Sequence, residues 1–503
     1  MYRTVAQLDS AMNFLSSFFP ALCTRVEMPN RSVQGRRIFA LHMHAGSATG
    51  RRKVFIVGGL HARELMNPDA IIDLQLDLAL AYLNGTGITL GGRSWSATDI
   101  KVMLESLDIW MLPCANPDGR EYVMTVDDMW RQNRRDNPGM CEGVDVNRNC
   151  DFVWGVTTGT TSCDPCMETY LGPGRFSEPE SRNIRDLCDM QNIDVFLDVH
   201  SFTELVLFPW GHTHTQTTDP TQRFTSLATG TCAPLNPPGH QEYMLPRDQL
   251  RFTTVAQTIV NDIRAVRGRN YTPQTSRALY ATTGTTSDYV YSRHIANPGL
   301  RKTYAFAFET GPPVLNPNGT INVPESFHPA DPTLVKRDAK AGMISLMQQS
   351  ICAIEFIGAT FLGLTTGLDS MRKVRDERLA TTAAGAEMVA LFERVQFPLL
   401  GMILVDESLT KEAMGLLDTC VKLLENEETV LTEREVERGL AFVDALVSRA
   451  ESKELLTDLE LVRKQLEGSA DKSVRKVLDD LLSTPTRTLT KKKKPTKKPR
   501  RKS

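Results

Sequence analysis

The chain has 503 residues, of which 41% are hydrophobic and 23% are charged, and its formal net charge is −2 at pH 7. This length allows one large domain and a smaller one. No apolar stretch reaches the roughly 18 residues that a membrane-spanning helix needs, so we expect no membrane span. All nine histidines lie before residue 330, whereas the last third is rich in Leu, Glu, Lys, Arg and Ala, which predicts a domain boundary near residue 360.

The first strong signal is a buried-strand pattern that ends in candidate metal ligands. Residues 54–57 (VFIV) have the β-branched and aromatic composition of a buried strand. Residues 58–64 (GGLHARE) follow directly. His61 and Glu64 therefore fall where a central strand delivers side chains to a cleft, and a metal site is the first hypothesis.

A zinc site in a hydrolase usually takes three His or Glu ligands and leaves the fourth position to water, so a third ligand must come from elsewhere. His200 is the best candidate because it ends another apolar strand pattern, residues 194–199. An HxxE motif also recurs by chance in long sequences, and a single histidine after a strand is more often a hydrogen-bonded structural residue. The hypothesis therefore needs support from independent residues.

Such residues follow in chain order. The chain contains Trp130-Arg131, the segment 143–149 (GVDVNRN), Tyr280, Ser287-Asp288 and the strand pattern 304–309 (YAFAFE). Together with His61, Glu64 and His200, these motifs resemble the zinc carboxypeptidases of the pancreatic A/B type, which remove C-terminal amino acids. The resemblance covers about residues 1–355 and depends on separate motifs spread along this length.

The resemblance implies an α/β fold with a mixed eight-stranded sheet, covered by helices on both faces, in a catalytic domain of residues 1–360. It implies one zinc ion per chain, held by His61, Glu64 and His200. The roles that it implies for other residues are these: Glu309 is the catalytic glutamate, Arg131 polarises the scissile carbonyl, Asn147 and Arg148 bind the terminal carboxylate, Tyr280 closes over the substrate, Arg63 lies in the substrate groove, and Asp145 hydrogen-bonds a zinc-bound histidine.

The chemistry of amide hydrolysis asks for these residue types independently of any family. Zinc lowers the pKa of bound water from about 15.7 to about 7, and a carboxylate such as Glu309 can take the proton and later pass it to the leaving amine. A guanidinium such as Arg131 can stabilise the charge that grows on the carbonyl oxygen. The planar fork of Arg148, with the amide of Asn147, suits a free carboxylate, which favours removal of the last residue only.

Substrate preference depends on Ser287, which matches the base of the side-chain pocket in this family. An acid there selects Lys or Arg, and an aliphatic residue selects apolar or aromatic side chains. Because serine carries no charge, we expect neutral, apolar or aromatic terminal residues, although an acid from elsewhere would allow a basic preference. Phe202, Cys150 and Thr285-Thr286 depart from the family pattern and affect the shape of the pocket rather than the reaction.

From about residue 367 to residue 484 the pattern changes to amphipathic helices, with Leu and Val at three- and four-residue spacing in 412–424, 436–447 and 455–466. This segment resembles no recognised family and predicts a small all-α module that is packed on the peptidase or tethered to it, with partner binding as the alternative. Residues 485–503 form a Lys/Arg-rich tail that we expect to be disordered. Such a tail suits an anionic surface, import factors or plain solvent.

The signals for the cellular compartment conflict. Cys141 and Cys166 match a cysteine pair that forms a disulfide in pancreatic members, and four Asn-x-Ser/Thr sequons are present, which suits secretion. Residues 1–20 show no signal peptide of basic and then apolar residues, and the family-like region begins almost at residue 1. Secretion and an intracellular location therefore both stay open.

Two other classes of protein fit parts of the pattern. A non-catalytic peptide-binding relative usually lacks a zinc ligand or the catalytic glutamate, and this chain has them all. A nucleic-acid-associated protein is suggested by the tail alone, without stacking aromatics or a reader motif. We therefore expect a monomeric metallocarboxypeptidase whose partner is a peptide or protein substrate with a free C-terminal carboxylate.

Overall fold

The computed structural model describes residues 2–351 except 47–50, 140, 215 and 228, and, beyond residue 351, residues 406–450 and 453–483 with scattered positions between 371 and 403. The chain divides into two compact units, Met1–Ile351 and Cys352–Ser503. The boundary predicted near residue 360 and the predicted tail, residues 485–503, lie outside the described residues.

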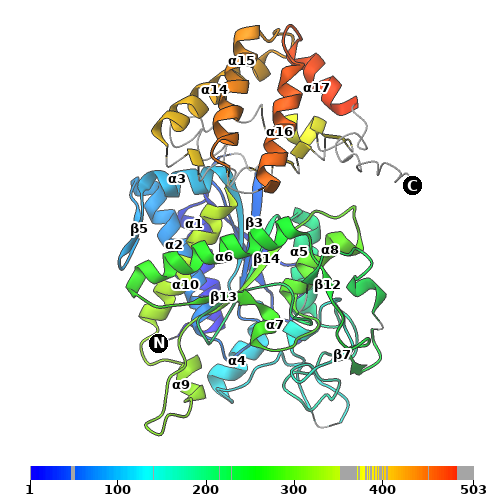
Figure 1. Ribbon diagram of the computed structural model, residues 1–503. Coiled ribbons are helices and arrows are strands. Elements are labelled where there is room, and N and C mark those ends of the chain that lie inside the picture. Colours follow the sequence, from blue (N-terminus) through cyan, green and yellow to red (C-terminus); the bar gives the residue numbers. More distant parts are fainter. Residues whose placement is uncertain are drawn as a thin grey trace, which may run out of the picture. The chain divides into compact units, whose positions relative to one another are not determined.

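Unit 1 is built around one eight-stranded sheet (Figure 1). In spatial order its strands are β1 (Cys23–Glu27), β2 (Phe39–Met43), β6 (Leu107–Leu112), β3 (Arg52–Gly58), β8 (Val195–His200), β14 (Tyr304–Glu309), β9 (Leu205–Phe208) and β13 (Thr272–Thr275). Strands β6, β3, β8 and β14 run parallel, whereas β2 is antiparallel to β6 and β9 is antiparallel to β14. The predicted mixed sheet is confirmed.

Helices and short strand pairs complete unit 1. The helices are α1 (Val5–Phe18), α2 (Met66–Asn84), α3 (Ala97–Ser106), α4 (Pro117–Thr125), α5 (Pro179–Gln191), α6 (Pro246–Arg267), α7 (Ser276–Leu279), α8 (Thr286–Ala296), α9 (Val323–Phe327) and α10 (Thr333–Ser350), with short 3-10 helices η1 (Val146–Arg148) and η2 (Phe224–Ser226). The strand pairs are β4 (Ile88–Leu90) with β5 (Arg93–Trp95), β7 (Val156–Thr157) with β11 (Ala233–Pro234), and β10 (Gln216–Thr217) with β12 (Glu242–Tyr243).

Helices cover both faces of the sheet. Successive side chains of a strand point to opposite faces, and in β14 the ring of Phe306 packs on Phe252 of α6 with centroids 5.3 Å apart. The neighbouring residue Ala307 pairs in register with Asp198 of β8, whose carboxylate accepts a hydrogen bond from Thr286 of α8 at 2.5 Å. Helices α6 and α8 therefore lie on opposite faces, and the central strands are buried between such layers.

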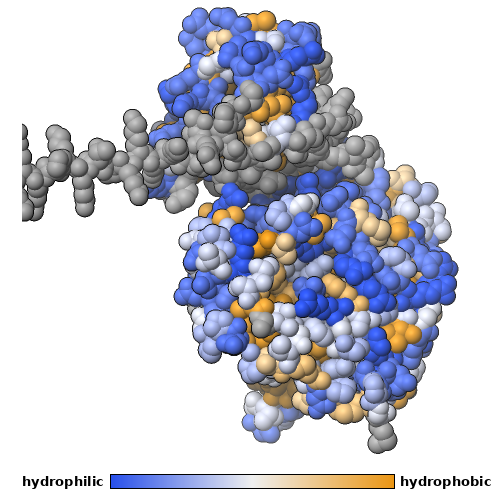
Figure 2. Space-filling view, turned by 90° about the vertical axis from the view of Figure 1, so that its right-hand side faces the viewer, coloured by the Kyte–Doolittle hydropathy of each residue, from blue (hydrophilic) through white to orange (hydrophobic). Residues whose placement is uncertain are grey.

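The surface of unit 1 is mainly polar, and its core is apolar. Figure 2 shows one face of the molecule, where hydrophilic residues predominate on unit 1 and apolar residues form small groups. Large side chains such as Trp95, Trp210 and Phe196 are buried. Among the described residues, no helix has the length and apolar character that crossing a membrane requires.

Two disulfides fasten the irregular segments of unit 1. One joins Cys141 to Cys166, the pair that the family resemblance implies, and the other joins Cys163 to Cys232, which the sequence analysis did not pair. Both close loops of the chain and so restrict its unfolded state.

The described part of unit 2 is helical. Its longer elements are α14 (Glu407–Glu425), α15 (Glu433–Val447), α16 (Lys453–Glu467) and α17 (Val474–Ser483), preceded by a π-helical turn η3 (Val374–Leu379). Apolar faces of α14, α15 and α16 meet in one core through residues such as Leu417, Val443 and Leu459. Each predicted amphipathic segment lies within one of these three helices, so the expected all-α module is confirmed.

Candidate active site

The loop after β3 carries His61 and Glu64. Gly59 has φ +65°, a left-handed conformation that favours glycine, and this turn brings the chain off the end of the strand. Asn116 fixes the loop, because its backbone N–H donates to the Gly59 carbonyl at 3.1 Å and its side-chain amide donates to the Leu60 carbonyl at 3.0 Å. The loop is therefore held at the carboxyl end of a central strand by one backbone and one side-chain hydrogen bond from Asn116.

His200 and Glu309 end two neighbouring parallel strands. His200 is the last residue of β8, Glu309 is the last residue of β14, and the two are direct register partners. The backbone N–H of Thr310 donates to the His200 carbonyl at 2.8 Å, which fixes both strand ends. Because β3 is parallel to β8, the loop with His61 reaches the same edge, where open α/β sheets commonly bind ligands.

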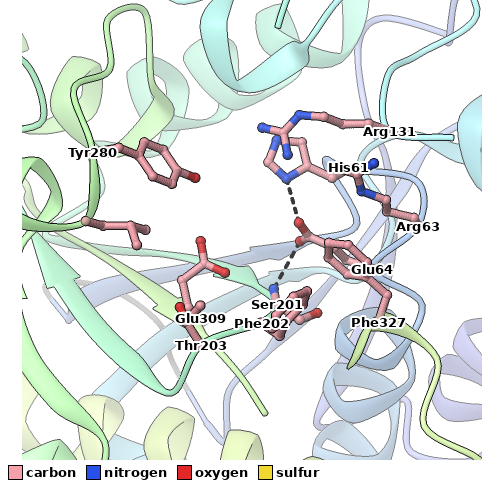
Figure 3. Close-up of a pocket in the computed structure, with 11 residues that line it drawn as sticks. His61, Arg63, Glu64, Arg131, Ser201, Phe202, Thr203, Tyr280, Glu309 and Phe327 are labelled. Atoms are coloured by element: carbon pink, nitrogen blue, oxygen red, sulfur yellow. Dashed lines mark hydrogen bonds and ion pairs between the residues drawn. The ribbon is translucent and has the colours of Figure 1, made fainter. Parts of the chain in front are cut away.

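The three predicted metal ligands converge, as Figure 3 shows for His61 and Glu64. Nδ1 of His61 lies 2.7 Å from Oε1 of Glu64, Nδ1 of His200 lies 3.0 Å from Oε2 of Glu64, and the two Nδ1 atoms are 3.1 Å apart. All three side chains are buried. Ligand atoms at about 2.0–2.2 Å from one tetrahedral zinc lie a little over 3 Å from one another, so this set fits a zinc ion with small adjustments.

The charge state of Glu64 suits metal binding. Burial raises its pKa, but the adjacent imidazoles of His61 and His200 outweigh burial and hold the pKa below its ordinary value. The backbone N–H of Ser201 also donates to Oε2 of Glu64 at 3.2 Å. Glu64 is therefore an ionised ligand held from several sides.

The ring nitrogens that face away from Glu64 have partners of their own. Nε2 of His61 lies 3.3 Å from Oδ1 of Asp145, and Nε2 of His200 lies 2.8 Å from Oδ2 of Asp198 and 3.2 Å from the side-chain nitrogen of Asn147. Carboxylates in such positions orient the ring and direct its other nitrogen to a metal. The sequence pointed to Asp145 but not to Asp198, which lies inside an apolar strand with no signal beyond its charge.

A cavity of about 160 Å³ opens beside two of the three residues, His61 and Glu64. Glu309 of β14, Tyr280 at the end of α7 and Arg131 after α4 point into it from different sides (Figure 3). Its full lining is His61, Arg63, Glu64, Arg131, Ser201, Phe202, Thr203, Leu279, Tyr280, Glu309 and Phe327. The cavity therefore joins a metal-binding group, a carboxylate and a guanidinium.

Burial and neighbouring charges set the charge states of Glu309 and Arg131. Burial raises the pKa of Glu309 to about 8, although His200 and Arg131 act in the opposite direction. Arg131 pairs with Asp145 through a nitrogen and Oδ2 that are 2.9 Å apart. A carboxyl group that titrates near neutrality can both accept and donate a proton, and a paired guanidinium is held in place.

The family of the chain follows from comparison with known proteins. A model described as zinc carboxypeptidase, Peptidase_M14, matches residues 8–322, which is more than half of the chain. The chain belongs to the zinc carboxypeptidase family. The family is one of zinc-dependent proteolytic hydrolases, and His61, Glu64 and His200 form a group that could hold the metal ion.

Relatives and solved structures agree with this family. The chain is 30% identical to carboxypeptidase B of Astacus astacus over 57% of this chain and 81% of that protein. It is 28% identical to an inactive metallocarboxypeptidase, ECM14, of Arthroderma otae over 58% of this chain, and spans only 47% of that relative. A structure of bovine thrombin-activatable fibrinolysis inhibitor, in complex with tick carboxypeptidase inhibitor, aligns with TM-score 0.52 at 20% identity over 70% of this chain and 97% of the other. Carboxypeptidase A of Helicoverpa armigera aligns with TM-score 0.50 at 23% identity over 69% and 74%, so the predicted carboxypeptidase fold is confirmed.

Three of the predicted substrate-binding residues stand outside the lining of the cavity. Oδ1 of Asn147 accepts a hydrogen bond from the Thr286 N–H at 2.9 Å, and Nε of Arg148 donates to the Thr160 carbonyl at 2.7 Å. Ser287 is buried in α8. Arg63 and Tyr280, by contrast, do line the cavity.

One further group of ligand-type side chains was not predicted from the sequence. His212, His240 and Glu242 are buried, and their ligand atoms lie within 4.8 Å of one another. The only sequence signal is the short H-x-E spacing of the last two residues, which is too common to point to a site.

Proposed function

We propose that this chain is an active zinc carboxypeptidase of the A/B type, which hydrolyses the last peptide bond of peptides or proteins. The observation that carries this proposal is the convergence of His61, Glu64 and His200. The first two of these line one cavity together with Glu309 and Arg131. The first three residues hold the metal, and the other two supply a proton carrier and a cation. A peptide bond in this cavity would meet the groups that its hydrolysis needs.

The mechanism assigns one task to each group. When bound, the zinc ion supplies Lewis-acid activation of water and of the scissile carbonyl. Glu309 accepts the proton of the attacking water and then donates it to the leaving amine, which its raised pKa supports. Arg131, held by Asp145, donates hydrogen bonds to the carbonyl oxygen as negative charge develops there.

Selection of the chain end is assigned to Arg148, Asn147 and Tyr280. A bidentate guanidinium and an amide suit a terminal carboxylate, and Asn147 lies close to the zinc site because its amide is 3.2 Å from Nε2 of His200. Tyr280 is 37% exposed and lines the cavity, so it is free to close over a peptide. Arg63 packs over the ring of Phe327 at the cavity wall and contributes positive charge to the groove.

We infer a preference for neutral, apolar or aromatic terminal residues from the uncharged Ser287. The adjacent acid, Asp288, is fully buried, and its Oδ2 accepts a hydrogen bond from the Gly211 N–H at 2.9 Å. A carboxylate bound in this way is a poor partner for an incoming basic side chain, because burying such a pair is costly. A basic preference is the alternative, since the Astacus relative is named carboxypeptidase B.

A peptide-binding protein without catalysis is the second candidate function, because one relative is named inactive. Against it stand the three side chains that could hold a metal and Glu309, which are all present; His61, Glu64 and Glu309 line one cavity. A binding protein would gain nothing from a half-buried glutamate beside these side chains, since an ionisable group is costly to bury.

The proposed carboxypeptidase activity can be tested directly. Purified protein with zinc is incubated with a peptide and with its C-terminally amidated twin, and products are followed by mass spectrometry. We expect release of the last residue from the free acid only, and a loss of about 10²–10⁴-fold in kcat for Glu309→Gln. A peptide series that ends in Phe, Leu, Lys or Glu gives the preference, which we expect to favour the first two.

A matched control is Glu325→Gln, which replaces an exposed glutamate on α9 and should hydrolyse the peptide at the wild-type rate. Equal cleavage of the free and amidated peptides would argue for an endopeptidase. Binding of the peptide without any cleavage would favour the non-catalytic candidate.

The disulfides also bear on location and partners. Two disulfides in unit 1 suit an oxidising compartment, since cytosolic thiols are normally kept reduced. We therefore propose a secreted or extracellular protein, acting as a monomer on peptide or protein chain ends. Contact of the basic tail with anionic surfaces or import factors stays a separate proposal, drawn from its charge alone.

A further inference from the structure

A second buried group of imidazoles and a carboxylate lies outside the active-site lining. Nε2 of His212 is 3.0 Å from Oε2 of Glu242, and Nε2 of His240 is 2.9 Å from the same oxygen. The three side chains are 1%, 2% and 0% exposed. Two rings and one carboxylate thus share a small volume that solvent does not reach.

This group repeats the composition of the proposed catalytic zinc site, with two histidines and one glutamate. The contacts from histidine to glutamate are 2.7 and 3.0 Å there and 3.0 and 2.9 Å here, whereas the ring centroids of the two histidines are 4.6 Å apart there and 5.8 Å apart here. We propose that His212, His240 and Glu242 form a second zinc-binding site with a structural role. Zinc suits this set because it combines imidazole nitrogen and carboxylate oxygen in tetrahedral sites.

The hydrogen bonds around Glu242 leave one oxygen for the ion. Its Oε1 accepts a hydrogen bond from the Phe224 N–H at 3.1 Å, so Oε2 faces both imidazoles. In the structure both rings share that one oxygen, as in a hydrogen-bonded group. A cation between the three atoms would instead give each of them a bond of its own.

Two unpartnered atoms behind His212 point the same way. Nδ1 of His212 and Oδ1 of Asp288 are buried and have no hydrogen-bond partner among the described residues, and the charge of Asp288 acts on His212. A metal-bound histidine commonly directs its second ring nitrogen towards a carboxylate. Asp288 therefore acts on His212 through its charge, and no hydrogen bond joins the two side chains.

The surroundings would keep the ion dry. The ring of Phe152 lies 5.1 Å from that of His212 and 5.0 Å from that of Phe224, and Trp210 lies 6.0 Å from His212. An apolar shell of this kind limits access of water and strengthens binding between charges.

The role of such an ion follows from where its ligands lie in the chain. His212 begins, and His240 and Glu242 end, a segment whose described residues contain turns, η2, the short strands β10 and β11, and the first residue of β12. The disulfide from Cys232 to Cys163 fastens the middle of this segment. An ion bound at the two ends would close this segment as a second cross-link. The ion would lie next to Gly211, whose N–H donates a hydrogen bond to Asp288 of α8.

The test counts zinc in full-length proteins. After dialysis against zinc and gel filtration, zinc per chain is measured by inductively coupled plasma mass spectrometry. We expect two ions in the wild type, one in His61→Gln/Glu64→Gln, one in His212→Gln/His240→Gln, and none when all four changes are combined. His294→Gln changes a histidine that bonds to the Tyr291 carbonyl and should keep both ions.

The decisive protein is His61→Gln/Glu64→Gln, whose second group is native. If this protein retains no zinc, the second site does not exist. If it retains one ion, and zinc raises its melting temperature, the second site is supported. This result holds even where the His212→Gln/His240→Gln protein fails to fold. Because this readout needs no catalysis, it stands apart from the proposed function. A protein that is inactive but binds two zinc ions would overturn only the proposed function, not the second zinc site.

Discussion

Two glutamates at the candidate active site, the buried Glu64 and the half-buried Glu309, differ in their neighbours. Glu64 lies between two imidazoles, which hold its pKa below the ordinary value in spite of burial, whereas burial raises the pKa of Glu309 to about 8. Environments that push two carboxyl pKa values apart usually separate their tasks. One residue is suited to bind the cation, and the other to carry a proton.

Another glutamate, Glu180, is buried in the first turn of α5 and makes the free energy of unfolding depend on pH. Burial raises its pKa to about 7 in the folded chain, so the folded state holds a proton that the unfolded chain has already lost above its ordinary value near 4.5. Stability from this group is therefore greatest at low pH and falls as pH rises towards 7. We expect the wild type to lose about 2 kcal/mol relative to Glu180→Gln between pH 5 and 7.5.

Urea unfolding of both proteins at several pH values measures this difference. The two proteins are compared by the slope of the unfolding free energy against pH. Its absolute value is not used, because glutamine also changes the hydrogen bonds to Asn133 and Val33. Glu325→Gln, at an exposed position, should parallel the wild type. Parallel curves for Glu180→Gln would show that Glu180 is not protonated in the folded chain.

Some residues of the site could be predicted from the sequence and others could not. His61, Glu64 and His200 follow apolar runs that are recognisable as strands, so their position at strand ends was predictable. Glu242 and its histidine neighbours come together through irregular chain, which carries no periodic pattern. The bonds that occupy Arg148 depend on the path of distant loops, so its identity could be predicted but its surroundings could not.

At the scale of elements, the packing of α10 on the sheet positions β14. A Cβ on Gly342 of α10 would lie 2.7 Å from Cε2 of Phe308, the residue before Glu309, and 3.1 Å from Cδ1 of Ile263. Glycine at this point lets the helix approach the strand closely. The strand that delivers the proposed base is therefore held by tight helix packing.

Gly342→Ala should destabilise unit 1. Overpacking typically costs about 1–3 kcal/mol, which exceeds the gain of up to about 1 kcal/mol from better helix propensity. Gly439→Ala on α15 is the matched change, since its Cβ would meet only ordinary contacts with Leu466 at 3.6 Å, and we expect it to be neutral or stabilising. Chemical denaturation followed by circular dichroism compares the two, and a Gly342→Ala protein as stable as wild type would contradict this account of the packing.

The elements themselves were predictable to different degrees. The carboxypeptidase sheet followed from a family resemblance, since apolar runs such as 54–57 and 304–309 do not by themselves give strand order. The helices of unit 2 followed from periodicity alone, because apolar residues at three- and four-residue spacing need a partner surface. Short strands such as β10 and β12 lack any such pattern and depend on tertiary contacts.

At the scale of the whole molecule, the chain combines two compact units with separate cores. Every residue assigned to zinc binding, catalysis or substrate binding lies in unit 1, before Ile351. We propose that unit 1 alone carries the carboxypeptidase chemistry and that unit 2 serves another purpose, such as binding a partner. The proposed carboxypeptidase activity depends on the metal at the first site.

Zinc removal and return tests that dependence most directly. The full chain is stripped with a chelator, zinc is titrated back, and release of the last residue from a free-acid peptide is measured at each step. The account predicts no release without zinc, recovery to the original rate, and no recovery in His61→Gln/Glu64→Gln at the same zinc concentration. Release that persists in the stripped protein, or that returns fully in the His61→Gln/Glu64→Gln protein, would contradict it.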